Sequence, residues 1–302
     1  MSSFRAILIP VLIGLGLPAA AAPYDVGRYT STGAGPVNTW WVETPGGGLI
    51  IIDAQRDLDQ ARAAIAAIKA VGRPVRVIFI THPHPDHVSG LALFKAAFQG
   101  ASVYAQAATR QEILHNTQGF LSRRPGGPAS IPVPDVVVGD AEDFVVDGAS
   151  VSARQIGAGE SSGTSIFLFP NAHFAATGDL MTPQAAPFMA EGRTGAWLEE
   201  LRSIKTVLRA GTRILPGHGD IDNMPDAADA QARYIEAYRS RVAQTMQAGG
   251  STWAPSPDQA ATIEMSVQRQ FPRASAASNL PDSQRRLMDL RAVSAELKRE
   301  LR

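Results

Sequence analysis

The amino-acid sequence predicts an α/β fold in which two β-sheets pack against each other. Short β-branched apolar runs alternate with stretches of helical periodicity up to residue 115. A second set of apolar runs, between residues 136 and 177, mirrors the first. Two similar blocks of strands fit two packed sheets better than one doubly wound sheet. The length of 302 residues allows one large α/β domain or two small ones.

The composition is that of an ordinary globular protein, with 45% hydrophobic residues and a mean hydropathy near zero. Lysine and arginine together number 28, as do aspartate and glutamate. Because nucleic-acid binding normally requires a basic excess, we expect no nucleic-acid partner. The chain has no cysteine, so disulfides are excluded and any side-chain metal ligands must be mainly histidine or carboxylate.

The N-terminus has the pattern of a secretory signal over residues 1–21. Arg5 supplies a short positive region, Ala6–Leu17 is apolar, and Ala19–Ala21 offers a small-residue cleavage site. The alternative is an uncleaved anchor, since the apolar stretch could almost span a bilayer. Two glycines and a proline within it favour cleavage. We therefore expect a periplasmic or secreted protein with no stable membrane span after cleavage.

The first block of elements follows an irregular stretch at residues 24–36 and includes a turn at Pro45–Gly48. Its strands are β-branched, and its longest helix has apolar residues at helical spacing and ends at Gly72. In order, we predict strands at Val37–Val42 and Leu49–Asp53, a helix at Leu58–Val71, a strand at Val75–Ile80, a helix at Leu91–Phe98, a strand from Val103–Tyr104 and a helix at Ala107–His115.

The second block follows a Pro/Gly/Arg-rich loop at residues 119–134, which is either a substrate-covering flap or mobile surface. We predict strands at Val136–Val138, Asp143–Val146, Val151–Ile156, Ile166–Phe169 and His173–Thr177, a helix at Thr194–Arg209, a strand at Thr212–Leu215 and a helix at Asp226–Gln247. Residues 22–248 would form the main domain. Residues 249–302, with a helix at Ser283–Leu301, would form a helical appendage that either packs on the core or serves another subunit. The oligomeric state is left open.

The densest group of potential metal ligands lies directly after the predicted strand Val75–Ile80. Three of the six histidines and one aspartate fall within six residues, at His82, His84, Asp86 and His87. Intervening prolines keep the first two histidines out of a regular helix, so they lie on a loop. Imidazole nitrogens with carboxylate oxygens suit zinc and its first-row neighbours. The alternative, a solvated loop with chance histidines, rarely combines this density with a preceding buried strand.

This His-x-His-x-Asp-His motif after an apolar strand resembles the signature of the metallo-β-lactamase superfamily, and the resemblance extends from about Val37 to Tyr238. It implies a four-layer αββα sandwich with a metal site, usually dinuclear, at one edge. In that family an aspartate at the place of Asp53 supports the metal loop. A turn or helix-capping aspartate is the alternative.

Three later segments offer further ligands, each after a predicted strand and beside glycines that allow close backbone approach. They contain Glu160, Asp179 and His218. In the family, the aspartate bridges two ions and the histidine binds the second. The departure is Glu160, where most members carry histidine. Either Glu160 binds the first ion with His82 and His84, as carboxylates do in the alkylsulfatase branch, or the first site is lost and the protein is mononuclear or inactive.

The resemblance implies a metal-dependent hydrolase acting on a small-molecule ester, lactone, amide or sulfate through a metal-bound hydroxide. The cofactors would be two divalent metal ions, with zinc expected and manganese or iron as alternatives. Asp86 would orient the hydroxide while binding the second ion with His87, Asp179 and His218. Glu160 would leave the core formally neutral rather than singly positive, which disfavours anionic substrates. The rival functions are an iron-dependent oxidoreductase of the same fold and a catalytically weakened metal-binding module.

Other residues receive weaker assignments. His173 begins the strand that leads to Asp179, roughly 20 Å from it at about 3.3 Å per residue, so we place it outside the site. His115 is expected at the surface or at a pocket rim. Phe120, Phe188 and Trp197 are either apolar pocket walls or ordinary core aromatics.

Overall fold

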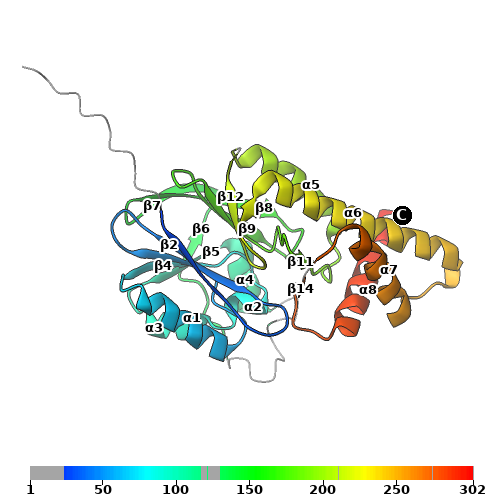
Figure 1. Ribbon diagram of the computed structural model, residues 1–302, viewed down its shortest axis with the longest axis horizontal. Helices are drawn as coiled ribbons and strands as arrows, with labels where there is room; N and C mark the ends of the chain where they lie inside the picture. The colour runs from blue at the N-terminus through cyan, green and yellow to red at the C-terminus, as the bar shows by residue number, and fades with distance from the viewer. Residues whose placement is uncertain (1–23, 117–120, 122–129, 210, 274, 302) are drawn as a thin grey trace, which may run out of the picture.

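The two predicted sheets pack against each other in the computed structural model, which describes residues 24–116, 121, 130–209, 211–273 and 275–301 (Figure 1). Each of the two sheets has six strands. One apolar core lies between the sheets, and a further core lies between each sheet and its helices. The layers are therefore helices, sheet, sheet and helices, which confirms the predicted αββα sandwich.

The first sheet has the strand order β1-β2-β3-β4-β5-β6. Strands β3 to β6 are parallel to one another, whereas β1, β2 and β3 are antiparallel. Its strands are β1 (Val26–Thr30), β2 (Asn38–Glu43), β3 (Leu49–Ile52), β4 (Val75–Phe79), β5 (Ser102–Gln106) and β6 (Val136–Val138). The helices beside it are α1 (Leu58–Ala70), α2 (Pro85–Val88), α3 (Leu91–Ala97) and α4 (Ala107–His115).

The second sheet has the order β13-β12-β10-β9-β8-β7 and is antiparallel except for the β10–β12 pair. Its strands are β7 (Ala141–Val146), β8 (Ala149–Gly157), β9 (Thr164–Phe169), β10 (Phe174–Gly178), β12 (Arg213–Pro216) and β13 (Asp222–Asn223). Helices α5 (Thr194–Val207) and α6 (Met224–Gly249) cover its outer side.

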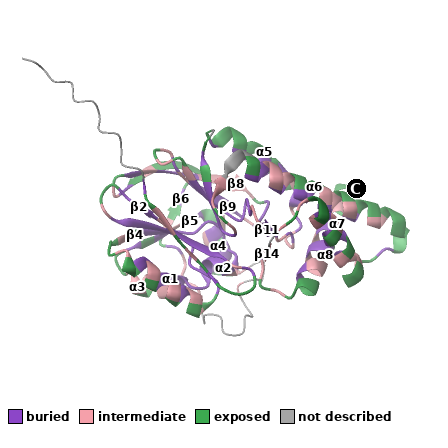
Figure 2. Ribbon diagram, in the orientation of Figure 1, coloured by how far each residue is buried: buried purple, intermediate pink, exposed green. Residues whose placement is uncertain are grey.

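The uninterrupted apolar runs of the first sheet follow from this layering. In β3, Ile50 and Ile52 pack between the sheets, while Leu49 and Ile51 pack under the helices. Successive side chains of a strand point to opposite faces, so a strand covered on both sides needs apolar residues throughout. Figure 2 shows the buried residues along the inner layers and exposed residues on the outer faces of the helices.

Several elements differ from the sequence predictions, among them two strands and one helix. Residues 26–30 form edge strand β1, although a segment rich in glycine, serine and threonine was expected to be irregular. Strand β6 pairs with β5 in the first sheet and so does not belong to the second block. Helix α7 (Pro257–Gln270) was not predicted, yet its start carries a capping box between Ser256 and Gln259.

The C-terminal segment packs on the core rather than standing apart from it. Besides α7, it contains η1 (Gly250–Thr252), β14 (Ser275–Ala276) and α8 (Asp282–Glu300). Leu290 and Val293 of α8 are buried in the same cluster as Tyr238 of α6. Strand β14 pairs in parallel with β11 (Ala185–Ala186). The predicted boundary at residue 248 falls inside α6, and the division into two units stays a prediction.

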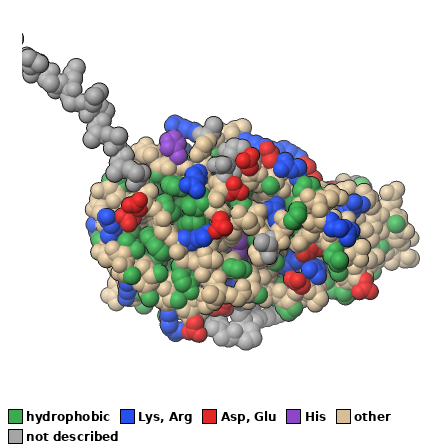
Figure 3. Space-filling view, in the orientation of Figure 1, with side chains coloured by type: hydrophobic (Ala, Val, Ile, Leu, Met, Phe, Trp, Pro, Cys, Tyr) green, Lys and Arg blue, Asp and Glu red, His purple; other side chains and the backbone are tan. Residues whose placement is uncertain are grey.

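The described surface carries mixed charge. In the face shown in Figure 3, acidic and basic side chains are interspersed, as expected for a formal net charge of zero. Within the described ranges, no helix is long and apolar enough to cross a membrane. The predicted signal at residues 1–21 lies outside the described residues, as does Phe120.

Candidate metal centre

Loops at one edge of the sandwich bring the predicted ligands together. His82 and His84 lie between β4 and α2, and Asp86 and His87 belong to α2 itself. Glu160, Asp179 and His218 follow β8, β10 and β12. All seven side chains are buried. Because both sheets present these strand ends at the same edge, residues that are up to 136 positions apart become neighbours.

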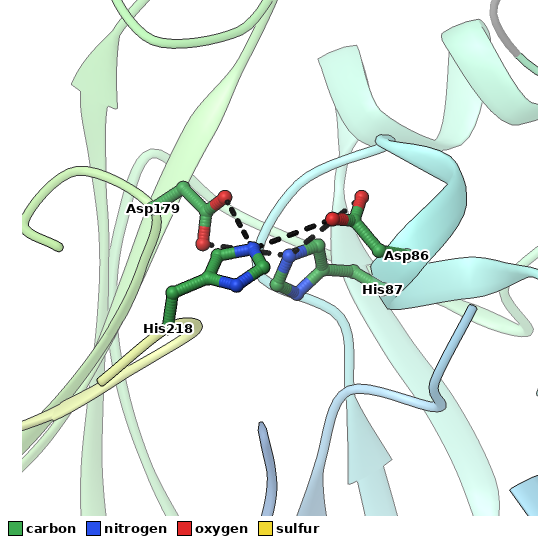
Figure 4. A group of neighbouring side chains, drawn as sticks. All are labelled: Asp86, His87, Asp179 and His218. Atoms are coloured by element: carbon green, nitrogen blue, oxygen red, sulfur yellow. Dashed lines mark ion pairs between the residues drawn. The ribbon is translucent and has the colours of Figure 1, made fainter. Parts of the chain in front are cut away.

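Four of the residues form one group, shown in Figure 4. Asp86 and His87 point from α2 toward Asp179 and His218, which come from the second sheet. His218 Nε2 lies 3.3 Å from Asp86 Oδ2 and 3.2 Å from Asp179 Oδ2. His87 Nε2 lies 3.4 Å from Asp179 Oδ1. One ligand atom from each residue falls within 4.8 Å of the others, a spacing that a single cation can span.

The other three residues form a second, adjacent group. Ligand atoms of His82, His84 and Glu160 also lie within 4.8 Å of one another. Glu160 Oε1 lies 3.1 Å from His84 Nδ1, and Oε2 lies 3.6 Å from His82 Nε2. The rings of His82 and His87 are 4.1 Å apart between centroids, so the two groups adjoin. Glu160 thus stands where the sequence placed a ligand, and its binding role stays a proposal.

Buried ligand atoms that lack hydrogen-bond partners support metal binding at the site. Six buried atoms that face the two groups have no hydrogen-bond partner in the described part of the chain: His82 Nε2, His87 Nε2, His218 Nε2, Asp179 Oδ1 and both carboxylate oxygens of Glu160. A buried polar atom without a partner costs on the order of 1–3 kcal/mol. Six of them converging on two points fit divalent cations, whose preferred ligands are these atoms.

Each histidine is also held by its other nitrogen. Nδ1 of His87 donates to Asp53, and Nδ1 of His218 to the carbonyl of Pro36. Nδ1 of His82 lies 3.0 Å from the hydroxyl of Thr81, and Nε2 of His84 lies 2.8 Å from Glu191. Such bonds fix the tautomer and leave one nitrogen of each ring directed into the site.

Asp53 supports the histidine loop as in the resembled family. One carboxylate oxygen accepts the backbone N–H of Thr81, and the other accepts the hydroxyl of Thr81 and Nδ1 of His87. Its φ of 62° is uncommon for a residue other than glycine. These bonds agree with the supporting interpretation rather than with a helix cap.

Two residues at the site were not identified from the sequence. Arg56 Nη2 donates to Asp86 Oδ2 at 2.9 Å, with both side chains almost fully buried. Glu191, in the loop before α5, contacts His84. Arg56 follows Asp53 at the carboxyl end of β3, a position where functional residues gather, so its place was a usable signal. Glu191 had no such signal because only the tertiary fold brings its loop to the site.

Burial and neighbouring charged side chains shift the pKa values of the site residues. Burial and the neighbouring His87 and His84 hold the pKa of His82 well below its usual value. Burial alone would lower the pKa of His84, but Glu160 and Glu191 raise it well above normal. Burial would raise the pKa of Asp86, but Arg56 and His87 outweigh it and hold it well below the usual range. Asp86 is therefore an ionised acceptor at neutral pH.

Glycines allow the strand ends to approach the ligands. A Cβ on Gly217 would lie 2.0 Å from Asp179 Oδ1 and 2.6 Å from His87 Cε1. A Cβ on Gly159 would lie 2.5 Å from the backbone of Trp197. No side chain fits at either place, so the glycines beside Glu160 and His218 are required by close packing.

The structure shows which of the residues with weaker assignments lie near the metal ligands. His173 and His115 are both exposed, and His173 lines a different cavity with Arg209 and Thr212. Trp197 is a core aromatic: it is buried and its Nε1 donates to the carbonyl of Leu180. Phe188 does reach the site, where its ring stands edge-on to His84 with centroids 6.0 Å apart.

A cavity of about 150 Å³ opens onto the two groups. His84, Asp86 and Asp179 form its polar side, together with Arg56. Phe188 and the C-terminal residues Ala277–Leu280 form much of the rest. A substrate in this cavity would therefore contact the candidate ligands directly.

Comparisons with known proteins agree with this geometry. A linear primary-alkylsulfatase from Pseudomonas sp. is 35% identical over 77 residues, which are 24% of this chain and only 15% of that protein. A hydroxyacylglutathione hydrolase from Acidiphilium cryptum is 28% identical over 215 residues, covering 68% of this chain and 77% of the relative. A solved metallo-β-lactamase family protein from Thermus thermophilus has a TM-score of 0.68 at 15% identity, covering 91% of this chain and 93% of its own. That last likeness shows the fold alone.

The family model described as the metallo-β-lactamase superfamily matches residues 32–218. This range contains both sheets almost completely and all seven candidate ligands. The sandwich fold and the clustered ligands agree with this family match, and the chain therefore belongs to the metallo-β-lactamase superfamily.

Proposed function

We propose that the protein is an exported hydrolase that uses two divalent metal ions, with zinc as the expected metal. The observation that carries the proposal is the convergence of six unpartnered buried ligand atoms on two adjacent points. His82, His84 and Glu160 would hold the first ion. Asp86, His87, Asp179 and His218 would hold the second, and the bridging role predicted for Asp179 is part of the proposal.

Divalent cations at these points would acidify a water molecule and polarise the substrate oxygen that gains charge. Asp86 lies beside both the second group and the cavity, so its ionised carboxylate can hold an attacking water by accepting its hydrogen bond. Arg56 keeps that carboxylate ionised and fixed in direction. Glu191 and Asp53 hold the imidazoles of His84 and His87, so little reorganisation is needed when substrate binds.

The substrate is proposed to be a small-molecule ester, thioester, lactone, amide or sulfate. The names of two relatives support parts of this range: hydroxyacylglutathione hydrolase supports a thioester, and linear primary-alkylsulfatase supports a sulfate ester. Glu160 places a carboxylate where the resembled alkylsulfatase branch has one, but the formally neutral core that it implies would attract an anionic sulfate ester less than a positive core would.

Glu160 should change the metal preference. Two divalent ions carry four positive charges, while Asp86, Asp179, Glu160 and one hydroxide would carry four negative charges. A neutral core acidifies water less than a positive one, and an added oxygen ligand favours harder ions such as manganese or iron. A Glu160→His variant should then bind zinc more selectively and shift its pH–rate profile to lower pH. Unchanged metal content and profile would refute this part of the proposal.

Export is proposed from residues 1–21, which would place the mature protein in the periplasm or outside the cell. N-terminal sequencing of the protein recovered from a periplasmic or culture fraction checks it. A mature N-terminus near Ala22 is expected. Recovery of the intact chain from the cytoplasm would contradict the export proposal and leave the metal site unaffected.

The central test combines metal analysis with a hydrolase screen. The full-length protein purified without added metal should contain close to two metal ions per chain and hydrolyse at least one compound among esters, thioesters, lactones, β-lactams, phosphodiesters and alkyl sulfates. Asp179→Ala and His84→Ala should lose metal and turnover but keep the wild-type circular dichroism. His173→Ala is the matched control, because His173 is exposed and lies away from the site.

The outcomes separate the alternatives. A metal-free protein, or full activity in Asp179→Ala, would overturn the proposal. Visible absorption from bound iron with oxygen uptake, and no hydrolysis, would favour the oxidoreductase. Bound metal with neither activity would favour the non-catalytic module.

A further inference from the structure

The C-terminal residues after α7 form a wall of the cavity that opens onto the metal centre. Ala277, Ser278, Asn279 and Leu280 all line that cavity, although they lie about 60 residues beyond the end of the family match at residue 218. Phe188, on the chain just after β11, lines the same cavity. We call residues Ser275–Leu280 the C-terminal wall.

Pairing with β11 holds the start of the C-terminal wall in place. Ser275 and Ala276 pair in parallel with Ala185 and Ala186, and the N–H of Ala277 donates to the carbonyl of Ala186 at 3.0 Å. Figure 1 shows β11 and β14 side by side between the sandwich and helices α7 and α8. The pairing joins the wall to the same chain segment that carries Phe188, so these two parts of the cavity lining are fixed relative to each other.

Contacts on either side of the wall add to this restraint. Before it, the guanidinium of Arg273 donates to the carbonyls of Thr182, Pro183 and Ala230. After it, Asp289 of α8 accepts the N–H of Met189 at 2.8 Å, next to Phe188. Arg285 in turn binds Asp289 and Glu264. The segment Leu180–Glu191 is thereby held from both α6 and α8.

A third contact closes the wall against the N-terminal part of the chain. A Cβ on Gly35 would lie 2.3 Å from the carbonyl of Ser278, so the two backbones touch directly. The carbonyl of Gly35 also accepts a hydrogen bond from Arg56 Nη1 at 2.8 Å. The Gly35 turn therefore connects the C-terminal wall to Arg56, and both the wall and Arg56 line the cavity together with Asp86.

The chemistry of this enclosure indicates what it accepts. Most of the exposed lining is apolar, and its apolar residues are Pro85, Phe188, Ala277 and Leu280. Among the described lining residues, Arg56 is the one lysine or arginine, and its guanidinium is engaged by Asp86 and two backbone carbonyls. His84, the other lining residue that can carry a positive charge, is engaged by Glu160 and Glu191. An anionic substituent placed away from the proposed metal ions would therefore be desolvated beside the described lining without a partner.

We propose that the C-terminal wall selects substrates with a compact, uncharged apolar group beside the reacting centre. A cavity of about 150 Å³ suits a group roughly the size of benzene, which an apolar protein cavity of that volume is able to bind. The inference rests on the proposed function, and it makes Leu280 and Phe188 specificity-determining residues of that site.

Alkyl hydroxamates of increasing length test the wall, because their head group binds active-site metals while their chain enters the cavity. Affinities of acetohydroxamate, butyrohydroxamate and hexanohydroxamate for the metal-loaded full-length protein are measured by calorimetry. For the wild type, each methylene should tighten binding roughly fourfold, equivalent to ~0.8 kcal/mol, until the cavity is filled. Leu280→Asn should reduce this step to less than twofold.

Two controls make the result specific. Met265→Ala removes an exposed apolar side chain of α7 away from this cavity and should keep the wild-type step. Succinic monohydroxamate, whose chain ends in a carboxylate, should bind at least tenfold more weakly than butyrohydroxamate. The chain-length step is a ratio within one protein, so a partly unfolded variant does not distort it. Leu280→Ala provides a second, milder truncation.

The outcomes distinguish this inference from the proposed function. Failure of acetohydroxamate to bind the wild type would overturn the metal centre and the wall with it. Binding of acetohydroxamate with equal chain-length steps in wild type and Leu280→Asn would overturn the wall alone. Tighter binding of the carboxylate-ended compound than of butyrohydroxamate would show that Arg56 recognises anions, and would also overturn the proposed selectivity.

Discussion

Arg56 and Asp86 form a buried ion pair at the rim of the metal centre, with 2.9 Å between Nη2 and Oδ2. The same carboxylate oxygen lies 3.3 Å from Nε2 of His218. Asp86 is thus shared between a fixed cation and the place proposed for the second ion. Arg56 directs the carboxylate, and it would also reduce the negative charge that Asp86 offers to an ion bound there.

The first prediction concerns this pair. Arg56→Met should lower kcat/KM about 10- to 100-fold, because a residue that orients a metal ligand typically has an effect of that size. The change in KM should be smaller than the change in kcat if Arg56 acts through Asp86 and does not bind substrate. Steady-state kinetics with a substrate from the hydrolase screen provide the measurement. Arg62→Met, in an exposed pair on α1, is the control and should behave as wild type.

The second prediction concerns Asp53. Asp53→Ala removes the carboxylate that accepts hydrogen bonds from His87 Nδ1 and from Thr81. The affinity of the site that contains His87 for its metal ion should therefore fall about 10- to 100-fold. Competition with a chromophoric chelator measures that affinity. The exposed Asp59 gives the matched variant Asp59→Ala, which should retain full metal affinity. Equal affinities in both variants would show that Asp53 acts only as a turn residue.

The third prediction concerns backbone approach at Gly217. Gly217→Ala places a methyl group 2.0 Å from Asp179 Oδ1, so the carboxylate or the loop must move. A displacement of about 1 Å at reacting groups is able to cost 100-fold in rate, and we expect a loss of at least that size. Gly100→Ala is the control, because a Cβ there meets open space. Normal turnover in Gly217→Ala would contradict the close packing.

The fourth prediction concerns pH and stability in the C-terminal helices. Burial raises the pKa of Asp289 to about 7, although Arg285 lies beside it and lowers it. In the unfolded chain the same group titrates near 3.8. Between these values the folded state binds more protons than the unfolded state, so the stabilising contribution present below about pH 4 is lost as the pH rises toward 7.

Urea unfolding of the metal-free chain at pH 5 and pH 8 measures this effect. Asp289→Asn cannot ionise, so its stability should fall less between the two pH values than that of the wild type, by on the order of 1 kcal/mol or more. Asp282→Asn, at an exposed position of α8, should follow the wild type. An identical pH dependence in all three proteins would show that Asp289 is ionised throughout.

Much of the fold was predictable because the strands carry strong local signals. Runs such as Leu49–Ile52 and Val75–Phe79 are apolar throughout or nearly so, and helix α1 has clear periodicity. Strand β1 was missed because it contains Gly27 and Arg28 and lies at a sheet edge, where pairing with β2 and not burial defines it. Strand β6 was placed in the wrong sheet, since three residues carry no information about their partner.

The sequence by itself determined the identity of seven ligand-type residues, because histidines spaced by prolines and acidic residues spaced by glycines are local patterns that follow apolar strands. The family resemblance already implied their division into two groups. The tertiary structure was needed to show that the two groups adjoin, that Arg56 and Glu191 contact them, and that Ala277–Leu280 line the cavity beside them. The reason is physical: these contacts join parts of the chain separated by 30 to more than 100 residues. Their energies depend on which strand ends the packed sheets bring to a common edge, and no local pattern encodes that.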